Sequence, residues 1–131
     1  MIYFFLKYKF IFYSINIILF ILYLFPGSLL GWFFFGNITL QPQITPNFLV
    51  SANHVYTFFL LSLIGLFTFK KLNKLSKLFK YLLSLAVVLE LLHMIIPNRS
   101  FEFSDLFGNL LGILIIILIN KFILSNDKFK K

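Results

Sequence analysis

The chain has 131 residues, of which 60% are hydrophobic and only 12% are charged. A soluble domain carries roughly 25% charged residues, so this chain has too few to cover a surface that faces water, and a lipid bilayer is its expected solvent. The absence of cysteine excludes disulfides, thiolate metal sites and thiol catalysis.

Four apolar segments follow one another along the chain and predict four transmembrane helices. A spanning helix needs about 20 residues, with a range of roughly 17 to 25. The two shorter segments are extended by flanking lysines, because a lysine can bury its stem in the apolar layer and keep its amine in water. We therefore predict an all-α fold, a four-helix transmembrane bundle formed as a single domain over residues 1–131, with helices at residues 10–25, 49–69, 81–96 and 105–124.

Basic residues gather on one side of the predicted bundle. Eleven of the twelve precede the first segment, separate the second from the third, or end the fourth. Cytoplasmic loops carry such an excess, so both termini are expected in the cytoplasm and the chain is predicted to be a multi-pass protein of the cytoplasmic membrane. The net charge of +8 then reflects topology and contact with anionic lipid, and no nucleic-acid partner is expected. The eleven residues are Lys7, Lys9, Lys70, Lys71, Lys74, Lys77, Lys80, Lys121, Lys128, Lys130 and Lys131.

The outward ends of the second and third predicted helices carry ionisable residues. His54 lies near the start of the second helix, and Glu90 and His93 are three residues apart on one face of the third, which Pro97 is expected to end. A charge at the bilayer centre costs about 2.5 to 3.5 kcal/mol, so these side chains are expected to turn into the bundle.

The fourth predicted helix begins with a second polar group. Ser104 is a candidate N-cap. Asp105 has two possible roles: its negative charge interacts favourably with the helix dipole in the first turn, or its side chain faces the bundle together with Asn109 on the same helix face. Gly108 and Gly112 form a small-xxx-small step that favours close helix packing. Before this helix lies Arg99, the one basic residue on the outward side, which either balances Glu102 or hangs over the polar cluster.

The spacing of these residues is similar to that of the VanZ-like family of small bacterial membrane proteins. The resemblance covers about residues 47–120, and His54 matches an upstream histidine of the family. Members often carry an Asp-Lys pair where this chain reads "NFLVSANH", and many carry Gln at the position of His93, which favours a binding role over a catalytic one there. The resemblance implies a place in the cell envelope and a link to glycopeptide (teicoplanin) resistance. Its motifs here are Glu90-x-x-His93, Pro97-x-Arg99 and Asp105-x-x-x-Asn109-x-x-Gly112.

Two functions fit this predicted pocket on the outward side. In the first, Arg99, His93 and Asn109 bind an anionic lipid-linked or envelope ligand, while Pro97, Gly108 and Gly112 serve the structure. In the second, the pocket is the active site of a membrane-embedded hydrolase or transferase. That reading assigns acid–base chemistry to His54, Glu90 and Asp105, although no nucleophile of the Gly-x-Ser-x-Gly type is present.

Two further readings have less support in the sequence. A helical di-iron centre needs two copies of Glu-x-x-His, and the chain has one, so at most His54, Glu90 and His93 would hold a single ion. We assign neither a metal nor another cofactor from the sequence. A channel is disfavoured because the charges stay in the outer third of the predicted bundle and leave no polar path across it.

Overall fold

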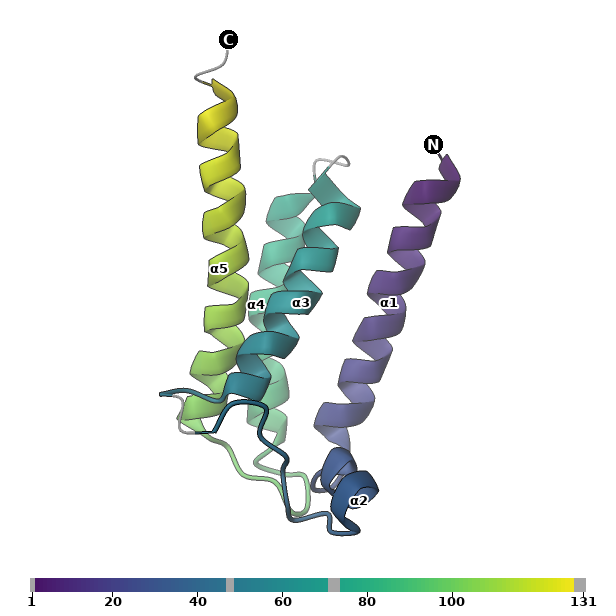
Figure 1. Ribbon diagram of the computed structural model, residues 1–131, viewed down its shortest axis with the longest axis vertical. Helices are drawn as coiled ribbons and strands as arrows, with labels where there is room; N and C mark the ends of the chain where they lie inside the picture. The colour runs from purple at the N-terminus through teal and green to yellow at the C-terminus, as the bar shows by residue number, and fades with distance from the viewer. Residues whose placement is uncertain (1, 47–48, 71–73, 129–131) are drawn as a thin grey trace.

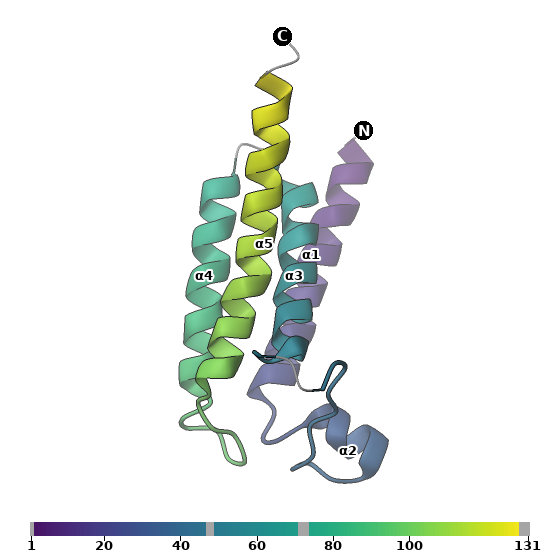
Figure 2. The same ribbon diagram turned by 60° about the vertical axis from the view of Figure 1, so that its left-hand side comes forward.

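The computed structural model describes residues 2–46, 49–70 and 74–128, and in these residues it contains helices and no strand. The all-α prediction is therefore confirmed for this part of the chain. Four long helices stand side by side, and a short fifth one turns away at one end of the bundle (Figure 1, Figure 2). The helices are α1 (Ile2–Leu24), α2 (Leu29–Phe35), α3 (Ala52–Phe69), α4 (Leu75–Leu92) and α5 (Phe103–Lys128).

The two ends of the bundle are built from different parts of the chain. We call the end at which α1 begins and α5 finishes the terminal end, and the end that carries α2 and residues 93–102 the α2 end (Figure 1). Of the lysines that predict the topology, Lys70, Lys74 and Lys77 lie at or near the terminal end. Lys71, Lys130 and Lys131 lie outside the described residues.

Two of the helices are long and apolar enough to cross a membrane, namely Ala52–Phe69 and Phe103–Ile123. A third span is present if the bent pair Lys9–Leu24 and Leu29–Phe35, whose axes differ by 79°, is taken as one. The helix α4 is less apolar because its 18 residues include Lys77, Lys80 and Glu90.

The predicted boundaries were wrong at the third helix. That helix was expected at residues 81–96, but α4 starts and ends earlier, at Leu75 and Leu92. Its end tightens into a turn, since His93 N–H donates to the carbonyl of Glu90, three residues back. A residue before proline avoids the helical conformation, so the chain cannot stay helical up to Pro97. Pro97 instead occupies a turn with Asn98, whose φ of 57° is left-handed and brings Arg99 back toward the bundle.

The other expected helices also shift at their ends, and α2 was not predicted. The first begins at Ile2 instead of residue 10, the second at Ala52 instead of residue 49, and the last covers Phe103–Lys128 instead of residues 105–124. The helix α2 forms where Ser28 Oγ accepts a hydrogen bond from Gly31 N–H at 2.9 Å, and it ends at Gly36, whose φ is 65°.

The core lies between the four long helices, and α3 and α5 approach each other most closely at two glycines. A Cβ on Gly108 would lie 2.7 Å from the carbonyl oxygen of Ser51, and one on Gly112 would lie 2.5 Å from that of Val55. Only glycine fits at either position without moving a backbone. The side chains that fill the core from the four helices include Phe12, Leu19, Phe58, Leu61, Leu82, Leu89 and Ile113.

Candidate functional site

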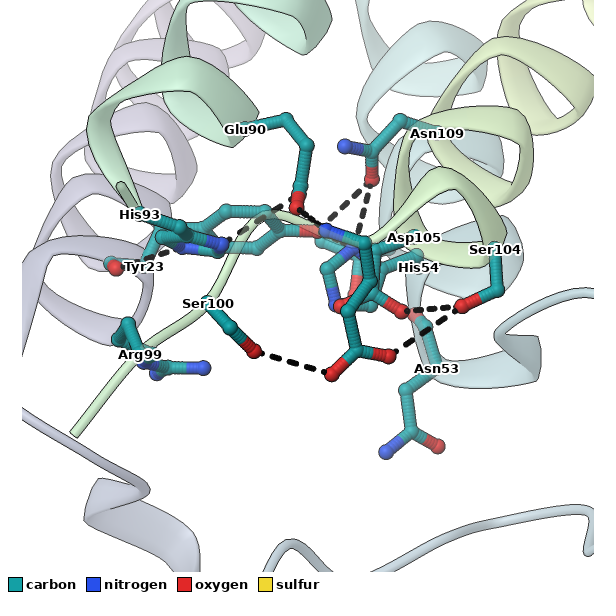
Figure 3. Close-up of polar contacts among 12 residues, drawn as sticks. Tyr23, Asn53, His54, Glu90, His93, Arg99, Ser100, Ser104, Asp105 and Asn109 are labelled. Atoms are coloured by element: carbon teal, nitrogen blue, oxygen red, sulfur yellow. Dashed lines mark hydrogen bonds and ion pairs between the residues drawn. The ribbon is translucent and has the colours of Figure 1, made fainter.

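Six buried polar side chains meet at the α2 end of the bundle. All four long helices contribute, and Figure 3 shows the side chains pointing toward one another. Each is less than a tenth exposed, apart from Asp105 at 15%. This polar cluster consists of Tyr23 of α1, His54 of α3, Glu90 of α4, His93 just after α4, and Asp105 and Asn109 of α5.

His54 is held at both of its ring nitrogens. Its Nδ1 lies 3.0 Å from Asn109 Oδ1, and its Nε2 lies 3.3 Å from Asp105 Oδ2. A carboxamide oxygen only accepts hydrogen bonds, so Nδ1 must carry the proton in this arrangement. The lone pair of a neutral His54 then lies on Nε2 and faces the carboxylate of Asp105.

Glu90 and His93 form the second pair of the cluster. Glu90 Oε1 accepts a hydrogen bond of 2.9 Å from the backbone N–H of Glu102, while Oε2 lies 3.4 Å from His93 Nδ1. His93 Nε2 donates to the carbonyl of Tyr23 at 3.1 Å. Glu90 is fully buried, yet its Oε2 accepts no hydrogen bond from the described residues.

Tyr23 connects these two pairs, although the sequence analysis did not select it. Its hydroxyl donates to Asn109 Oδ1 at 3.0 Å and lies 3.2 Å from His54 Nδ1. Its ring stacks on His93, with centroids 5.8 Å apart and planes at 24°. Tyr23 is one of many aromatic residues in an apolar segment, and only its position near the outward end of the first predicted helix could have singled it out.

Arg99 lies beside this cluster and is bonded to the end of α1. Its Nη2 donates to the carbonyl of Leu22 at 2.9 Å, and its Nε donates to that of Phe25 at 3.3 Å. Of the two roles that the sequence left open for Arg99, pairing with Glu102 is not observed: no ion pair joins the two in the described chain, and Glu102 accepts hydrogen bonds from Ser100 and Ser104. Burial lowers the pKa of Arg99, and the nearby Tyr23, Asp105 and Glu90 oppose that shift. The guanidinium remains a cation at neutral pH.

Two cavities open next to Arg99. The larger, of about 340 Å³, lies against Tyr23, His54 and the start of α2, and most of its remaining lining is apolar. The smaller, of about 220 Å³, is polar and is bordered by Ser28, His93 and Asp105. Arg99 lines both cavities, whereas Asn109 lines neither because it is fully buried against His54.

The remaining predicted residues occupy structural positions. Ser104 is not the N-cap of α5, since the helix begins at Phe103 and the Ser104 hydroxyl bonds to the carboxylates of Glu102 and Asp105. Gly108 lies against Ser51 and His54, so it brings α5 close to the residue that carries the buried imidazole. Another residue that the sequence analysis missed is Asn53, whose side chain holds the loop at Pro42 and Ile44.

Three donors of the cluster are close enough to hold a metal ion. One donor atom each from His54, Glu90 and Asp105 lies within 4.8 Å of the other two. The sequence had suggested His93 as the third ligand, but both His93 nitrogens are directed at Tyr23 and Glu90. No protein-family model, curated protein or solved structure matches the chain. The chemistry of the site must therefore be argued from its own geometry.

Proposed function

We propose that the chain is a multi-pass protein of the cytoplasmic membrane. In this proposal α1, α3, α4 and α5 cross the bilayer as a four-helix bundle, both termini lie in the cytoplasm, and the α2 end faces outward. The lysine distribution supports this orientation. Large apolar side chains that would contact lipid are exposed along the helices and include Ile17, Leu60, Leu114 and Leu118.

The pocket at the α2 end, we further propose, binds an anionic lipid-linked or envelope ligand. The observation that carries this proposal is the state of Arg99, a partly buried cation that lines both cavities without a carboxylate partner among the described residues. Its hydrogen bonds go to neutral carbonyls, and Nη1 makes none within the described chain. A phosphate or carboxylate placed there would supply the missing negative charge and accept charge-assisted hydrogen bonds.

The lining of the larger cavity favours an amphipathic ligand. Leu22, Leu30, Phe34 and Ile44 form apolar walls that lead to Arg99. An alkyl or prenyl chain suits these walls, while an anionic headgroup suits the smaller polar cavity, which Arg99 also lines. A lipid-linked phosphate therefore fits better than a small soluble anion. This role agrees with a VanZ-like envelope protein linked to glycopeptide (teicoplanin) resistance, which the resemblance implies.

Arg99→Gln tests this proposal with the purified full-length chain in nanodiscs of neutral lipid. The probe is a polyprenyl phosphate, and Trp32, the single tryptophan, reports its binding from α2 by fluorescence. We expect the affinity to fall by about tenfold to a hundredfold, because a hydrogen bond to a charged group contributes roughly 1.5 to 3 kcal/mol.

Lys77→Gln is the matched control, since it removes one positive charge near the terminal end and should leave the affinity unchanged. Equal binding by wild type and Arg99→Gln, or equal loss in both variants, would contradict the proposal. Binding of the uncharged polyprenol with undiminished affinity would show that the headgroup charge is not recognised.

The pairing of His54 with Asp105 favours a second candidate, a hydrolase or transferase acting on the same class of ligand. The two side chains are 3.3 Å apart, and each lines a cavity at the α2 end. A histidine beside a carboxylate can take up a proton that the carboxylate stabilises, and it can carry that proton during acyl or phosphoryl transfer. Release of inorganic phosphate from the bound probe, abolished in His54→Gln while probe binding persists, distinguishes this enzyme from a binding protein.

A further inference from the structure

We propose that His54, Glu90 and Asp105 bind a divalent transition-metal ion, either Zn²⁺ or Mn²⁺. The three ligands come from α3, α4 and α5, and their donor atoms already lie within 4.8 Å of one another. The bundle therefore gathers one nitrogen and two carboxylate oxygens from distant parts of the sequence at one point (Figure 3).

The distance between His54 and Asp105 suits two ligands of one ion. Zinc binds nitrogen and oxygen at about 2.0 to 2.2 Å, so neighbouring ligands of a tetrahedral site are separated by about 3.3 to 3.6 Å. His54 Nε2 and Asp105 Oδ2 are 3.3 Å apart. The Nε2 lone pair of a neutral His54 would repel the carboxylate at this distance, and either a proton on Nε2 or a metal cation between the two atoms turns that contact into attraction.

Asn109 gives His54 the tautomer that a metal ligand requires. A histidine that binds a metal through one nitrogen usually donates the other N–H to a carbonyl or carboxylate, which fixes the ring. Here Nδ1 donates to Asn109 Oδ1 at 3.0 Å, and that oxygen also accepts the hydroxyl of Tyr23. Asn109 is thus a positioning residue, and Nε2 is left free for an ion.

Glu90 supplies an observation that is independent of the His54–Asp105 pair. Its side chain is fully buried, and its Oε2 accepts no hydrogen bond within the described residues. A buried carboxylate is costly unless it is paired, fully hydrogen-bonded or bound to a metal. Its contact with His93 Nδ1, at 3.4 Å, is longer than a charge-assisted hydrogen bond and leaves room for a stronger partner. Coordination would satisfy this oxygen.

The donor set limits the identity of the ion. Imidazole suits zinc and similar transition metals, and carboxylates also suit manganese, while sites that use thiolate are excluded by the absence of cysteine. Three protein ligands leave a further coordination position open, as in catalytic zinc sites. Asp105 and Arg99 border the same cavity, so this position would be available to the anionic headgroup. This last step rests on the proposed function, whereas the metal site itself does not.

Metal content tests the proposal without any assay of activity. The full-length protein in detergent micelles is stripped with a chelator, titrated with Zn²⁺ or Mn²⁺ alone by calorimetry, and analysed for bound metal after gel filtration. We expect the wild type to bind one ion per chain. Asp105→Asn should weaken binding by at least about a hundredfold, and Asn109→Ala by about tenfold to a hundredfold, which is the usual effect of losing a hydrogen bond to a metal ligand.

Glu102→Gln is the matched control, because Glu102 is an acidic residue three positions before Asp105 whose side chain bonds only to Ser100 and Ser104 in the described chain. It should bind the ion like wild type, and gel filtration checks that every variant is folded. A wild-type metal content equal to that of Asp105→Asn overturns the site, as does loss of binding in Glu102→Gln.

Arg99→Gln separates this proposal from the proposed function. It should bind the metal like wild type and bind polyprenyl phosphate about tenfold to a hundredfold more weakly. A wild type that binds the lipid phosphate but no metal overturns the metal site alone. One that binds the metal but no lipid phosphate overturns the proposed function alone.

Discussion

The two halves of the bundle both bury polar side chains, but they satisfy them differently. Toward the terminal end, Tyr81 donates to Asn16 Oδ1 at 2.6 Å, and Asn16 Nδ2 donates to the carbonyl of Phe12 at 2.8 Å. This pair is neutral and joins α4 to α1. At the α2 end the buried groups include the ionisable His54, Glu90 and His93, and Glu90 Oε2 accepts no hydrogen bond from the described residues.

The neutral pair near the terminal end holds two helices together. The ionisable groups at the α2 end also join helices, but they leave an oxygen to which the proposed ligand could bind. Neutral atoms of Ser62, Asn109 and Asn120 also have no hydrogen-bond partner among the described residues, but an unbonded hydroxyl or amide costs far less to bury than a carboxylate with an unbonded oxygen. Charge together with incomplete bonding is therefore the observation that supports placing the proposed site at the α2 end.

The largest effect is expected from Gly112→Ala. The new Cβ would lie 2.5 Å from the carbonyl oxygen of Val55 and 2.7 Å from the amide nitrogen of Phe59, so α5 must move away from α3. We expect the free energy of unfolding, measured by titration with SDS, to fall by about 2 to 3 kcal/mol. The ligand affinity of the polar cluster should fall as well, since α5 carries Asp105 and Asn109.

Gly65→Ala is the control for this change. Its Cβ would meet the side-chain tips of Leu78 and Phe12 at 2.9 and 3.0 Å, and such tips can rotate away. The gain in helix propensity, up to about 1 kcal/mol, should offset most of that cost. If Gly65→Ala and Gly112→Ala lower the free energy of unfolding by similar amounts, the contact of α5 with α3 at Gly112 is no tighter than the packing around Gly65.

A smaller effect is expected when one hydroxyl is removed from each half. Tyr23→Phe deletes the donor to Asn109 Oδ1, and Tyr81→Phe deletes the donor to Asn16 Oδ1. Each should lower the free energy of unfolding by about 1 kcal/mol, the usual net contribution of one hydrogen bond. Only Tyr23→Phe should also weaken binding of Zn²⁺ and polyprenyl phosphate. If Tyr81→Phe weakens binding equally, the two halves do not differ in function.

Regular helix geometry explains how much of the candidate site could be predicted. Glu90 and His93, three residues apart, do contact each other, and Asp105 and Asn109, four apart, both reach His54. These contacts follow from the number of residues per helical turn and from the level along the bundle at which each helix begins or ends. The close approach of α5 to α3 follows in the same way from Gly108 and Gly112.

The remainder depends on contacts that spacing alone does not determine. Arg99 bonds to carbonyls at the end of α1, more than seventy residues earlier, only because a left-handed turn at Asn98 redirects the chain. Tyr23 joins the cluster because α1 packs on α3 with one particular rotation about its axis. No periodic pattern in a segment so uniformly apolar reports that rotation, so the sequence could not assign Tyr23 to the site.

The smallest effect is expected at the rim of the larger cavity. Asn53 anchors the loop that borders this cavity, since its Nδ2 donates to the carbonyl of Pro42 at 2.6 Å and its Oδ1 accepts from Ile44 N–H at 2.9 Å. Asn53→Ala should loosen the loop and lower the affinity for polyprenyl phosphate by only a few-fold, because water can replace one exposed and one partly buried hydrogen bond. Asn37→Ala removes comparable bonds to Thr39 within the loop and should leave the affinity unchanged. A larger loss in Asn37→Ala would mean that the loop as a whole, and not its anchor on α3, shapes the pocket at the α2 end.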